Sequence, residues 1–278
     1  MKAINKMTFF SCPLCSLPLE KFDSCARCST GHSFDMAKEG YINLTVSNKK
    51  HSDVSGDDKE MVKARTFFLE GGYYSPLREK ICSLIEETKI ACPSVLDSGC
   101  GEGYYTYAYC DIVSKMNGQV LGVDLSKTAI KHAAKKCRRG DFAVASVYHL
   151  PILDNSIDIL INCFSPLAPE EFKRVVKSGG FFFYVVPDAK HLWGLKEVLY
   201  ENPYENNIKL DEYDGFEYVK TEVVENFFSL DSTEKILSLL NMTPYTWKTS
   251  KDGIQRLQKL TQLDVTAQFR IIIYKKSD

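Results

Sequence analysis

The chain has 278 residues, of which 44% are hydrophobic and 26% charged, so it is long enough for one sizeable globular domain and a smaller one. Its formal net charge of −1 excludes a basic surface overall, and any contact with nucleic acid must use a local patch. The apolar run Met7–Phe10 is too short for a signal peptide, and Phe181–Val186 is too short to span a membrane. We therefore expect a cytoplasmic protein with no membrane partner.

Residues 1–45 are predicted to form a zinc-binding module. Four of the ten cysteines fall between residues 12 and 28, and clustered cysteines in a cytosolic chain indicate a metal site rather than disulfides. The spacing C-x₂-C-x₁₂-C-x₃-H supplies three thiolates and an imidazole, a set that zinc prefers in closed structural sites. The predicted ligands are Cys12, Cys15, Cys28 and His32. Cys25 forms another C-x₂-C pair with Cys28, so a site with Cys25 in place of His32 stays open.

The segment Phe34–Leu44 mixes aromatic and basic side chains. Phe34 or Tyr41 could stack on RNA bases while Lys38 contacts a phosphate. Alternatively, the aromatic rings pack beneath the zinc module. We expect packing for Phe34, and both interpretations stay open for Tyr41.

Residues 46–93 are predicted to lead from the module into a second, larger domain. Thr45–Glu60 is polar and is expected to be a loop. Residues 59–70 have a helical pattern that Gly71-Gly72 interrupts, and Leu77–Glu87 resumes it with apolar residues at i, i+4, i+7 and i+8.

The catalytic domain, predicted over residues 94–278, begins with the sequence VLDSGCGEGYYT at Val95–Thr106. Apolar residues reach Asp97, glycines follow at alternate positions (Gly99, Gly101 and Gly103), and a helix can start after them. Glycine permits positive φ and close approach of a ligand to the backbone. An acid followed by G-x-G-x-G resembles motif I of Rossmann-like S-adenosylmethionine (SAM) dependent methyltransferases, in which the acid and the turn hold the methionine end of the cofactor. An ordinary glycine turn is the alternative.

Strands and helices then alternate, which predicts a doubly wound, mostly parallel sheet. Strands are expected at Gln119–Asp124, Phe142–Ser146, Ser156–Cys163 and Phe181–Pro187, with a helix at Glu170–Lys177 and a turn at Gly179-Gly180. A ligand of such a sheet lies at the carboxyl ends of the strands, where Asp97, Asp124, Ser146 and Asn162 all fall. Asp124 is positioned in the sequence to accept hydrogen bonds from ribose hydroxyls.

The last eighty residues carry weaker patterns. Phe216–Phe227 and Thr266–Tyr274 are predicted to close the sheet as an antiparallel pair, and the aromatic residues of Met242–Trp247 are expected to fill core.

Two histidines lie near the predicted strands. His191 follows the fifth strand, so contact with cofactor or substrate and a surface position are equally open. His149 is expected to be a surface histidine.

The ordered set of the Cys/His spacing, FDMAKEGYINL, GYYSPLR, VLDSGCGEGYYT and NMTPYTW resembles the RlmA family of 23S rRNA guanine-N1 methyltransferases over nearly the whole chain. The resemblance implies a zinc domain for RNA recognition, a SAM-dependent domain, an N1-methylguanine product in a 23S rRNA hairpin loop, and a homodimer. It assigns zinc to Cys12, Cys15, Cys28 and His32, and cofactor contacts to Tyr74, Gly101, Glu102 and His191. The segment Asn162–Pro166 departs from the I-Y-A-P wording of one branch, so the methylated guanine stays open.

Guanine N1 carries a proton, so either a base removes it or the site stabilises the O6-enolate form. Glu102 or Asp158 could serve, but the sequence assigns no catalytic residue. The sequence also leaves two alternative functions open. The first is a small-molecule SAM-dependent methyltransferase with a structural zinc appendage. The second is a zinc-dependent RNA-binding module with a vestigial SAM fold.

Overall fold

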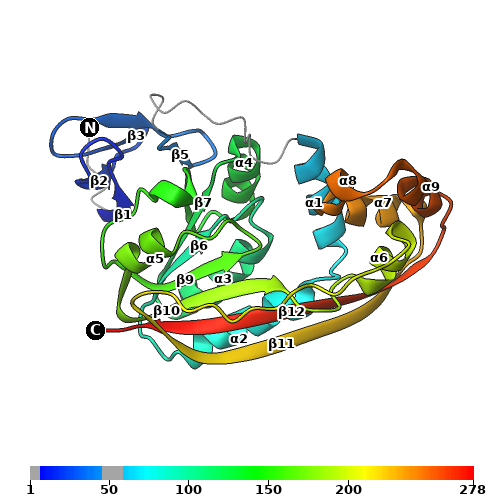
Figure 1. Ribbon diagram of the computed structural model, residues 1–278. Coiled ribbons are helices and arrows are strands. Elements are labelled where there is room, and N and C mark those ends of the chain that lie inside the picture. Colours follow the sequence, from blue (N-terminus) through cyan, green and yellow to red (C-terminus); the bar gives the residue numbers. More distant parts are fainter. Residues whose placement is uncertain (1–6, 46–58) are drawn as a thin grey trace.

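The computed structural model of the protein describes residues 7–45 and 59–278. Most of the predicted polar loop, residues 46–58, lies outside the described residues. The described strands form a four-stranded sheet close to the N-terminus and an eight-stranded sheet that runs through the molecule (Figure 1).

The small sheet is antiparallel, with strand order β1-β2-β3-β4. Its strands are short: β1 (Met7–Ser11), β2 (Pro18–Lys21), β3 (Cys25–Arg27) and β4 (Ser33–Asp35). The chain then leaves this sheet, and β5 (Ile42–Asn43) pairs in parallel with β8 (Asp141–Val144) of the large sheet. Residues before position 45 therefore extend the large sheet at its edge.

The large sheet is mostly parallel, as predicted. Besides β5 and β8 it contains β6 (Ser94–Ser98), β7 (Gln119–Asp124), β9 (Ile157–Cys163), β10 (Val176–Pro187), β11 (Phe216–Leu230) and β12 (Leu263–Lys276). The order is β11-β12-β10-β9-β6-β7-β8-β5, and the pairs from β10 to β5 are parallel. The last two strands form the antiparallel closing pair expected from the sequence.

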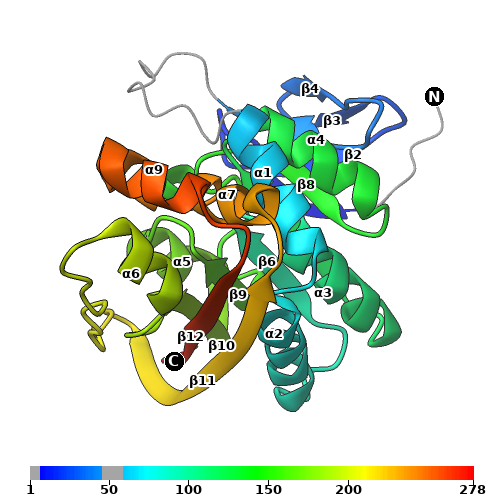
Figure 2. The ribbon, with the colours of Figure 1, turned by 90° about the vertical axis from the view of Figure 1, so that its right-hand side faces the viewer.

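Alternation along the strands divides the interior into two cores, one on each face of the sheet. Val95 and Ile159 belong to one core, and their neighbours Leu96 and Leu160 belong to the other. The first face is covered by α2 (Ser75–Glu87), α3 (Tyr104–Lys115) and α4 (Lys127–Lys136), and the second by α5 (Pro169–Val175) together with the N-terminal module (Figures 1 and 2). A 3₁₀ turn, η1 (Val147–His149), follows β8.

The remaining helices gather at the opposite end from the small sheet (Figure 1). They are α1 (Lys59–Glu70), α6 (Trp193–Leu199), α7 (Thr233–Asn241), α8 (Tyr245–Lys248) and α9 (Lys251–Gln258). Here α7 packs against α1 and α9, while α6 packs against β12 and α9. We call this group the helical cap.

Two expectations need correction, and the alternatives left open for Tyr41 are resolved. Gly179 and Gly180 do not end an element but lie inside β10, at a shift of register where Gly179 has φ +73°. Trp247 does not fill the core, since 76% of it is exposed, whereas Tyr245 packs partly buried against the core. Tyr41 is buried in the core, which excludes base stacking by its ring, and Phe34 packs partly buried, as expected.

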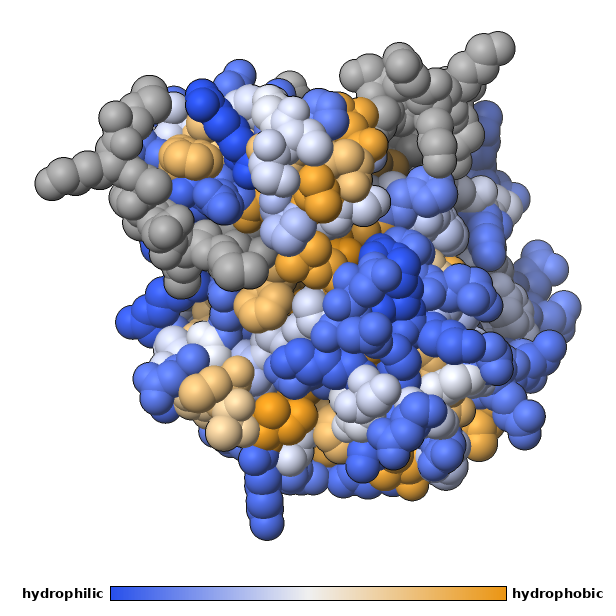
Figure 3. All heavy atoms as spheres, turned by 90° about the vertical axis from the view of Figure 1, so that its left-hand side faces the viewer, coloured by the Kyte–Doolittle hydropathy of each residue, from blue (hydrophilic) through white to orange (hydrophobic). Residues whose placement is uncertain are grey.

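The surface on the side of the N-terminal module is mainly hydrophilic, with smaller hydrophobic groups between (Figure 3). Across the described residues, 7–45 and 59–278, no helix has the length and apolar character needed to cross a membrane.

Candidate functional site

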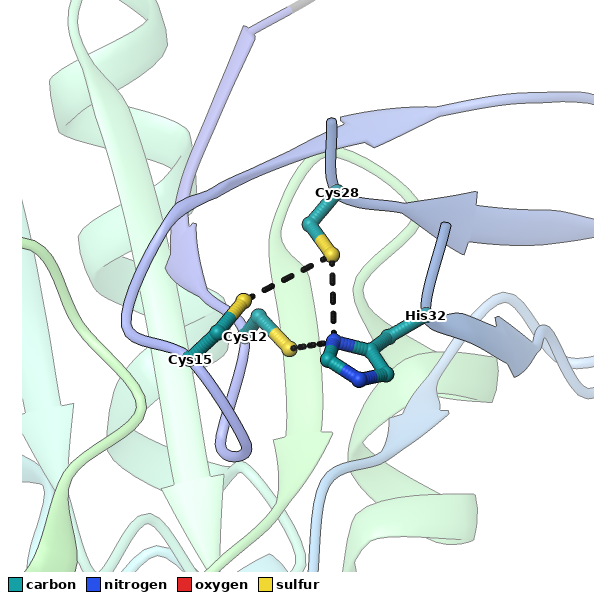
Figure 4. A group of neighbouring side chains, drawn as sticks. All are labelled: Cys12, Cys15, Cys28 and His32. Carbon is teal, nitrogen blue, oxygen red and sulfur yellow. Dashed lines mark hydrogen bonds between the residues drawn. The ribbon is translucent and has the colours of Figure 1, made fainter. Parts of the chain in front are cut away.

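Four side chains converge in the N-terminal module, with their ligand atoms all within 4.8 Å of one another: Cys12, Cys15, Cys28 and His32 (Figure 4). The Sγ atoms of Cys15 and Cys28 are 3.7 Å apart, and His32 Nδ1 is 3.5 Å from the Sγ atoms of Cys12 and Cys28. A tetrahedral zinc ion with ordinary bond lengths has S–S edges of about 3.7 Å and S–N edges of about 3.5 Å. These three separations match the edges of a tetrahedral zinc site, and all four ligand atoms lie within 4.8 Å of one another.

Cys25 takes a different position. It lies in β3, is buried, and pairs across the sheet with Asp35. The group of potential ligands contains His32 and not Cys25 among the described residues, which favours the Cys₃His set. Near the ligands, the Thr30 hydroxyl lies 3.0 Å from Cys28 Sγ and lowers the pKa of that thiol to about 6. A thiolate is the form that binds metal.

The N-terminal module is attached to the large sheet through backbone hydrogen bonds. Ser11, next to Cys12, donates to the Pro151 carbonyl at 2.9 Å, and Leu153 donates to the Phe9 carbonyl at 3.0 Å. The segment after η1 is held in turn by Arg174, whose guanidinium donates to the carbonyls of residues 150 and 152 and to the carboxylates of residues 154 and 171. The zinc ligands thus stand beside the carboxyl edge of the sheet.

The glycine turn connects β6 to α3. Its three glycines, Gly99, Gly101 and Gly103, all have positive φ, between +55° and +85°. A Cβ on Gly99 would lie 1.9 Å from Ser165 Oγ, and one on Gly103 would lie 2.9 Å from Ala133 Cβ, so these two glycines permit close packing. Gly101 differs, because the nearest atom to its Cβ would be an Arg65 nitrogen at 3.8 Å. The space at Gly101 is open towards a ligand.

Asp124 ends β7 beside this turn. One carboxylate oxygen accepts from the Gly101 amide at 3.0 Å, and the other accepts from the Ser126 amide at 2.8 Å. Ser126 itself caps α4 by accepting from the Ala129 amide. The carboxylate is thereby fixed at the cleft described below, at the end of a strand where an acid suits ribose hydroxyls.

Asp97 is buried at the end of β6. Thr106 donates to it at 2.6 Å, but desolvation dominates and, with the nearby charges of Asp124 and Glu102, raises the pKa of Asp97 to about 7. The carboxyl group is therefore easily protonated until a cation or further donors reach it.

Tyr74 and His191 meet although they are 117 residues apart. The Tyr74 hydroxyl is 3.4 Å from His191 Nε2, and His191 Nδ1 is 2.9 Å from the Gln268 carbonyl oxygen. The Gln268 amide nitrogen also lies near Nδ1, at 3.3 Å, but the shorter contact is to the carbonyl oxygen, which can only accept. This favours a proton on Nδ1 and leaves Nε2 as the acceptor. Burial lowers the pKa of His191 to about 3 and raises that of Tyr74, so both side chains are neutral. His191 is thus buried beside Tyr74, which excludes the surface alternative.

A single cleft of about 1960 Å³ joins these parts. It runs from Cys12 and Pro13 past the glycine turn to Met242 and Tyr245 of the cap region. Of the predicted cofactor residues, the cleft is lined by Tyr74, Gly99, Gly101, Glu102, Asp124, Ser146 and His191, while Asp97, Gly103 and Asn162 lie behind its wall.

Two family models match separate segments of the chain. Residues 10–53 match the family described as RlmA, N-terminal, a zinc ribbon, and residues 95–180 match the methyltransferase domain family. A candidate 23S rRNA (guanine-N1)-methyltransferase of Bacillus subtilis is 30% identical over 99% of this chain and 100% of its own. The 23S rRNA (guanine(748)-N1)-methyltransferase of Streptomyces fradiae is 30% identical over 91% of this chain and 90% of its own. The chain belongs to the RlmA family of 23S rRNA (guanine-N1)-methyltransferases.

Membership in the RlmA family makes SAM and zinc the cofactors. The residues of the two sites fit both zinc and SAM. Three of the separations between the zinc ligands equal tetrahedral edges, and the glycine turn leaves room at Gly101 beside an anchored carboxylate. One predicted catalytic candidate does not belong to this site. Asp158 begins β9, at the opposite edge of the sheet, where it binds Lys177 and Ser94. Its role is structural, so its proposal as a base is wrong.

Sequence reasoning missed three residues that shape the cleft. Arg174 has the network given above. Lys196 is buried, with Nζ donating to the Tyr204 carbonyl at 3.0 Å and to Asn206 Oδ1 at 2.9 Å, and so fixes a segment of the cleft wall. Phe164 is exposed in the cleft with φ +54°. Of these three, only Phe164 could have been found from a local sequence pattern, because it is an aromatic residue directly after a strand that ends at the ligand-binding edge.

His149, which was predicted to be a surface residue, is exposed.

Proposed function

We propose that the protein methylates N1 of a guanine in a hairpin loop of 23S rRNA. The observation that carries this proposal is the cleft that reaches from Cys12, one of the zinc ligands, to the glycine turn. A small metabolite needs no such continuity with a zinc ribbon, whereas an RNA loop is large enough to contact both parts. Family membership supports the same substrate, since the relative from Streptomyces fradiae is named for guanine 748 of 23S rRNA.

We assign zinc to Cys12, Cys15, Cys28 and His32. We assign SAM to the residues at the carboxyl edge of the sheet: Tyr74, Asp97, Gly99, Gly101, Glu102, Gly103, Asp124, Ser146, Asn162 and His191. Asp97, Gly103 and Asn162 lie behind the cleft wall, and we propose that they act by fixing the residues that line the cleft. The division into a zinc module (1–45), a connection (46–93) and a methyltransferase domain (94–278) is part of the proposal, as are the cytoplasmic location and the homodimer that the family resemblance implies.

Bound SAM supplies an electrophilic methyl group. The protein must hold an unstacked guanine in line with that group and accept the N1 proton, because a methylated N1 can no longer carry it in the neutral base. Glu102 remains the candidate base, since it is buried, lines the cleft and belongs to the glycine turn. Fixed neutral partners such as His191 and Tyr74 keep the site from reorganising during transfer.

The test is methylation of purified 23S rRNA with labelled SAM, followed by primer extension. Methylation at N1 blocks base pairing, so a new reverse-transcriptase stop at a loop guanine is expected. A stop at the position matching guanine 748 would give this chain the specificity of the Streptomyces fradiae relative. SAM binding without label in any RNA would contradict the proposal and favour a small-molecule substrate.

A further inference from the structure

The segment after β9 holds an aromatic residue in a strained backbone conformation. Phe164 has φ +54°, a region in which a bulky side chain is disfavoured and which often marks functional sites. The segment is anchored on both sides of this residue. The Phe164 amide donates to the Val185 carbonyl at 3.2 Å, and the amide group of the buried Asn162 donates to the Pro166 carbonyl at 3.0 Å. The strain is therefore maintained by the surrounding structure.

The side chain of Phe164 is directed into the cleft. It is 43% exposed and lines the cleft, whereas the preceding residue Cys163 is buried. Its ring centroid lies 5.7 Å from that of the buried Phe269, which in turn contacts the rings of Tyr74 at 4.7 Å and His191 at 4.8 Å. The ring is thus supported from one side by the aromatic group that includes two assigned cofactor residues.

The next residue places this segment against the cofactor turn. Ser165 packs so closely on Gly99 that a Cβ there would lie 1.9 Å from its hydroxyl oxygen. Phe164 therefore lines the cleft next to the glycine turn that we assign to SAM.

We propose that Phe164 is the stacking platform for the target guanine, a role that rests on the proposed function. A guanine taken out of its loop loses its stacked neighbours, and an aromatic face replaces that interaction. The rigid left-handed backbone holds the ring at a fixed place beside the glycine turn, so that the base is positioned as well as bound. Phe164 acts by positioning and transfers no proton.

The experiment compares Phe164→Leu and Phe164→Tyr with the wild type in methylation of 23S rRNA. Leucine keeps an apolar side chain without a π face, so kcat/KM for RNA is expected to fall by about tenfold or more, and tyrosine is expected to retain wild-type activity. SAM affinity, measured by calorimetry, stays unchanged in both variants. Tyr107→Leu is the matched control, since Tyr107 is a 41% exposed aromatic residue outside this cleft.

A second measurement uses RNA with 2-aminopurine at the mapped position, because stacking quenches its fluorescence. Phe164→Leu should give brighter bound RNA than the wild type. Equal kcat/KM and equal fluorescence in Phe164→Leu and wild type would overturn the inference, as would a loss of SAM affinity that accounts for the whole defect. Absence of RNA methylation by the wild type would instead overturn the proposed function itself.

Discussion

Thr106 donates a hydrogen bond of 2.6 Å to Asp97, and through it the first turns of α3 are tied to the end of β6. Both residues are buried. A single donor does not replace the water that a carboxylate loses on burial, so the pKa of Asp97 stays raised, at about 7. His191, also buried, has its pKa lowered to about 3. The two pKa shifts have opposite directions, and both affect the stability of the fold between about pH 4 and pH 6.5.

The Asp97 shift predicts a pH-dependent stability in the absence of SAM. Between about pH 4 and 7 the folded chain holds a proton on Asp97 that the unfolded chain has released, since the ordinary pKa is 3.8. The free energy of unfolding therefore loses up to about 1.4 kcal/mol per pH unit from this group as pH rises. Asp97→Asn removes that loss. Urea denaturation at a series of pH values should show the variant gaining stability relative to the wild type towards pH 7.

His191→Gln is the matched comparison. The unfolded chain takes up a proton on His191 as pH falls below about 6.5, while the folded chain does not until about pH 3, so this group contributes stability that is lost on acidification. Relative to the wild type, His191→Gln should gain stability towards low pH, the opposite sign to Asp97→Asn. Parallel profiles for the three proteins would contradict both burial effects.

Substitutions in the glycine turn should separate SAM binding from folding. Gly101→Ala meets open space and an accessible left-handed φ, so its cost in stability should be on the order of 1–2 kcal/mol, yet its methyl group would occupy the space assigned to SAM. Gly103→Ala would meet Ala133 at 2.9 Å and should mainly lower stability. Calorimetry with SAM and thermal unfolding without it test this contrast. Wild-type SAM affinity in Gly101→Ala would show that the cofactor lies elsewhere.

The zinc ligands can be tested with two neighbouring cysteines. Cys12→Ser should hold less than one equivalent of zinc by metal analysis and unfold at a lower temperature, because metal binding stabilises so small a module. Cys25→Ser, at a buried cysteine outside the cluster, should keep one equivalent. A full equivalent of zinc in Cys12→Ser, or its loss in Cys25→Ser alone, would point to a different ligand set.

The features predicted correctly from the sequence depend on short-range patterns. The zinc ligands lie within residues 12–32, and the strand-turn-helix around Gly99 and the acid at the end of β7 are equally local in the sequence. Their convergence followed from the rule that parallel strands direct their carboxyl ends to one edge. Asp158 shows the limit of that reasoning, because it lies on the correct strand but at the amino end.

Other features depend on contacts between distant residues. Lys196 reads as the polar side of a short helix, and only folding brings Tyr204 and Asn206 around its ammonium group. Trp247 was expected in the core because large aromatic residues are usually buried, yet in this fold α8 leaves its ring outside. The pairing of Tyr74 with His191 likewise joins residues 117 positions apart, which no local pattern could indicate.

The pairing of β5 with β8 limits how this protein can be recombined with its relatives. Because residues 42 and 43 cover the edge of β8, and Phe10 and Leu19 share a core with Leu121 and Ile152, the first 45 residues are not an independently exchangeable cassette. A chimera that carries the zinc ribbon of another protein would have to reproduce the β5–β8 pairing and these core contacts as well as the metal ligands. Removal of the ribbon would leave an open strand edge, a template for intermolecular pairing. Specificity in this architecture is therefore best altered by changing side chains along the cleft rather than by exchanging whole segments.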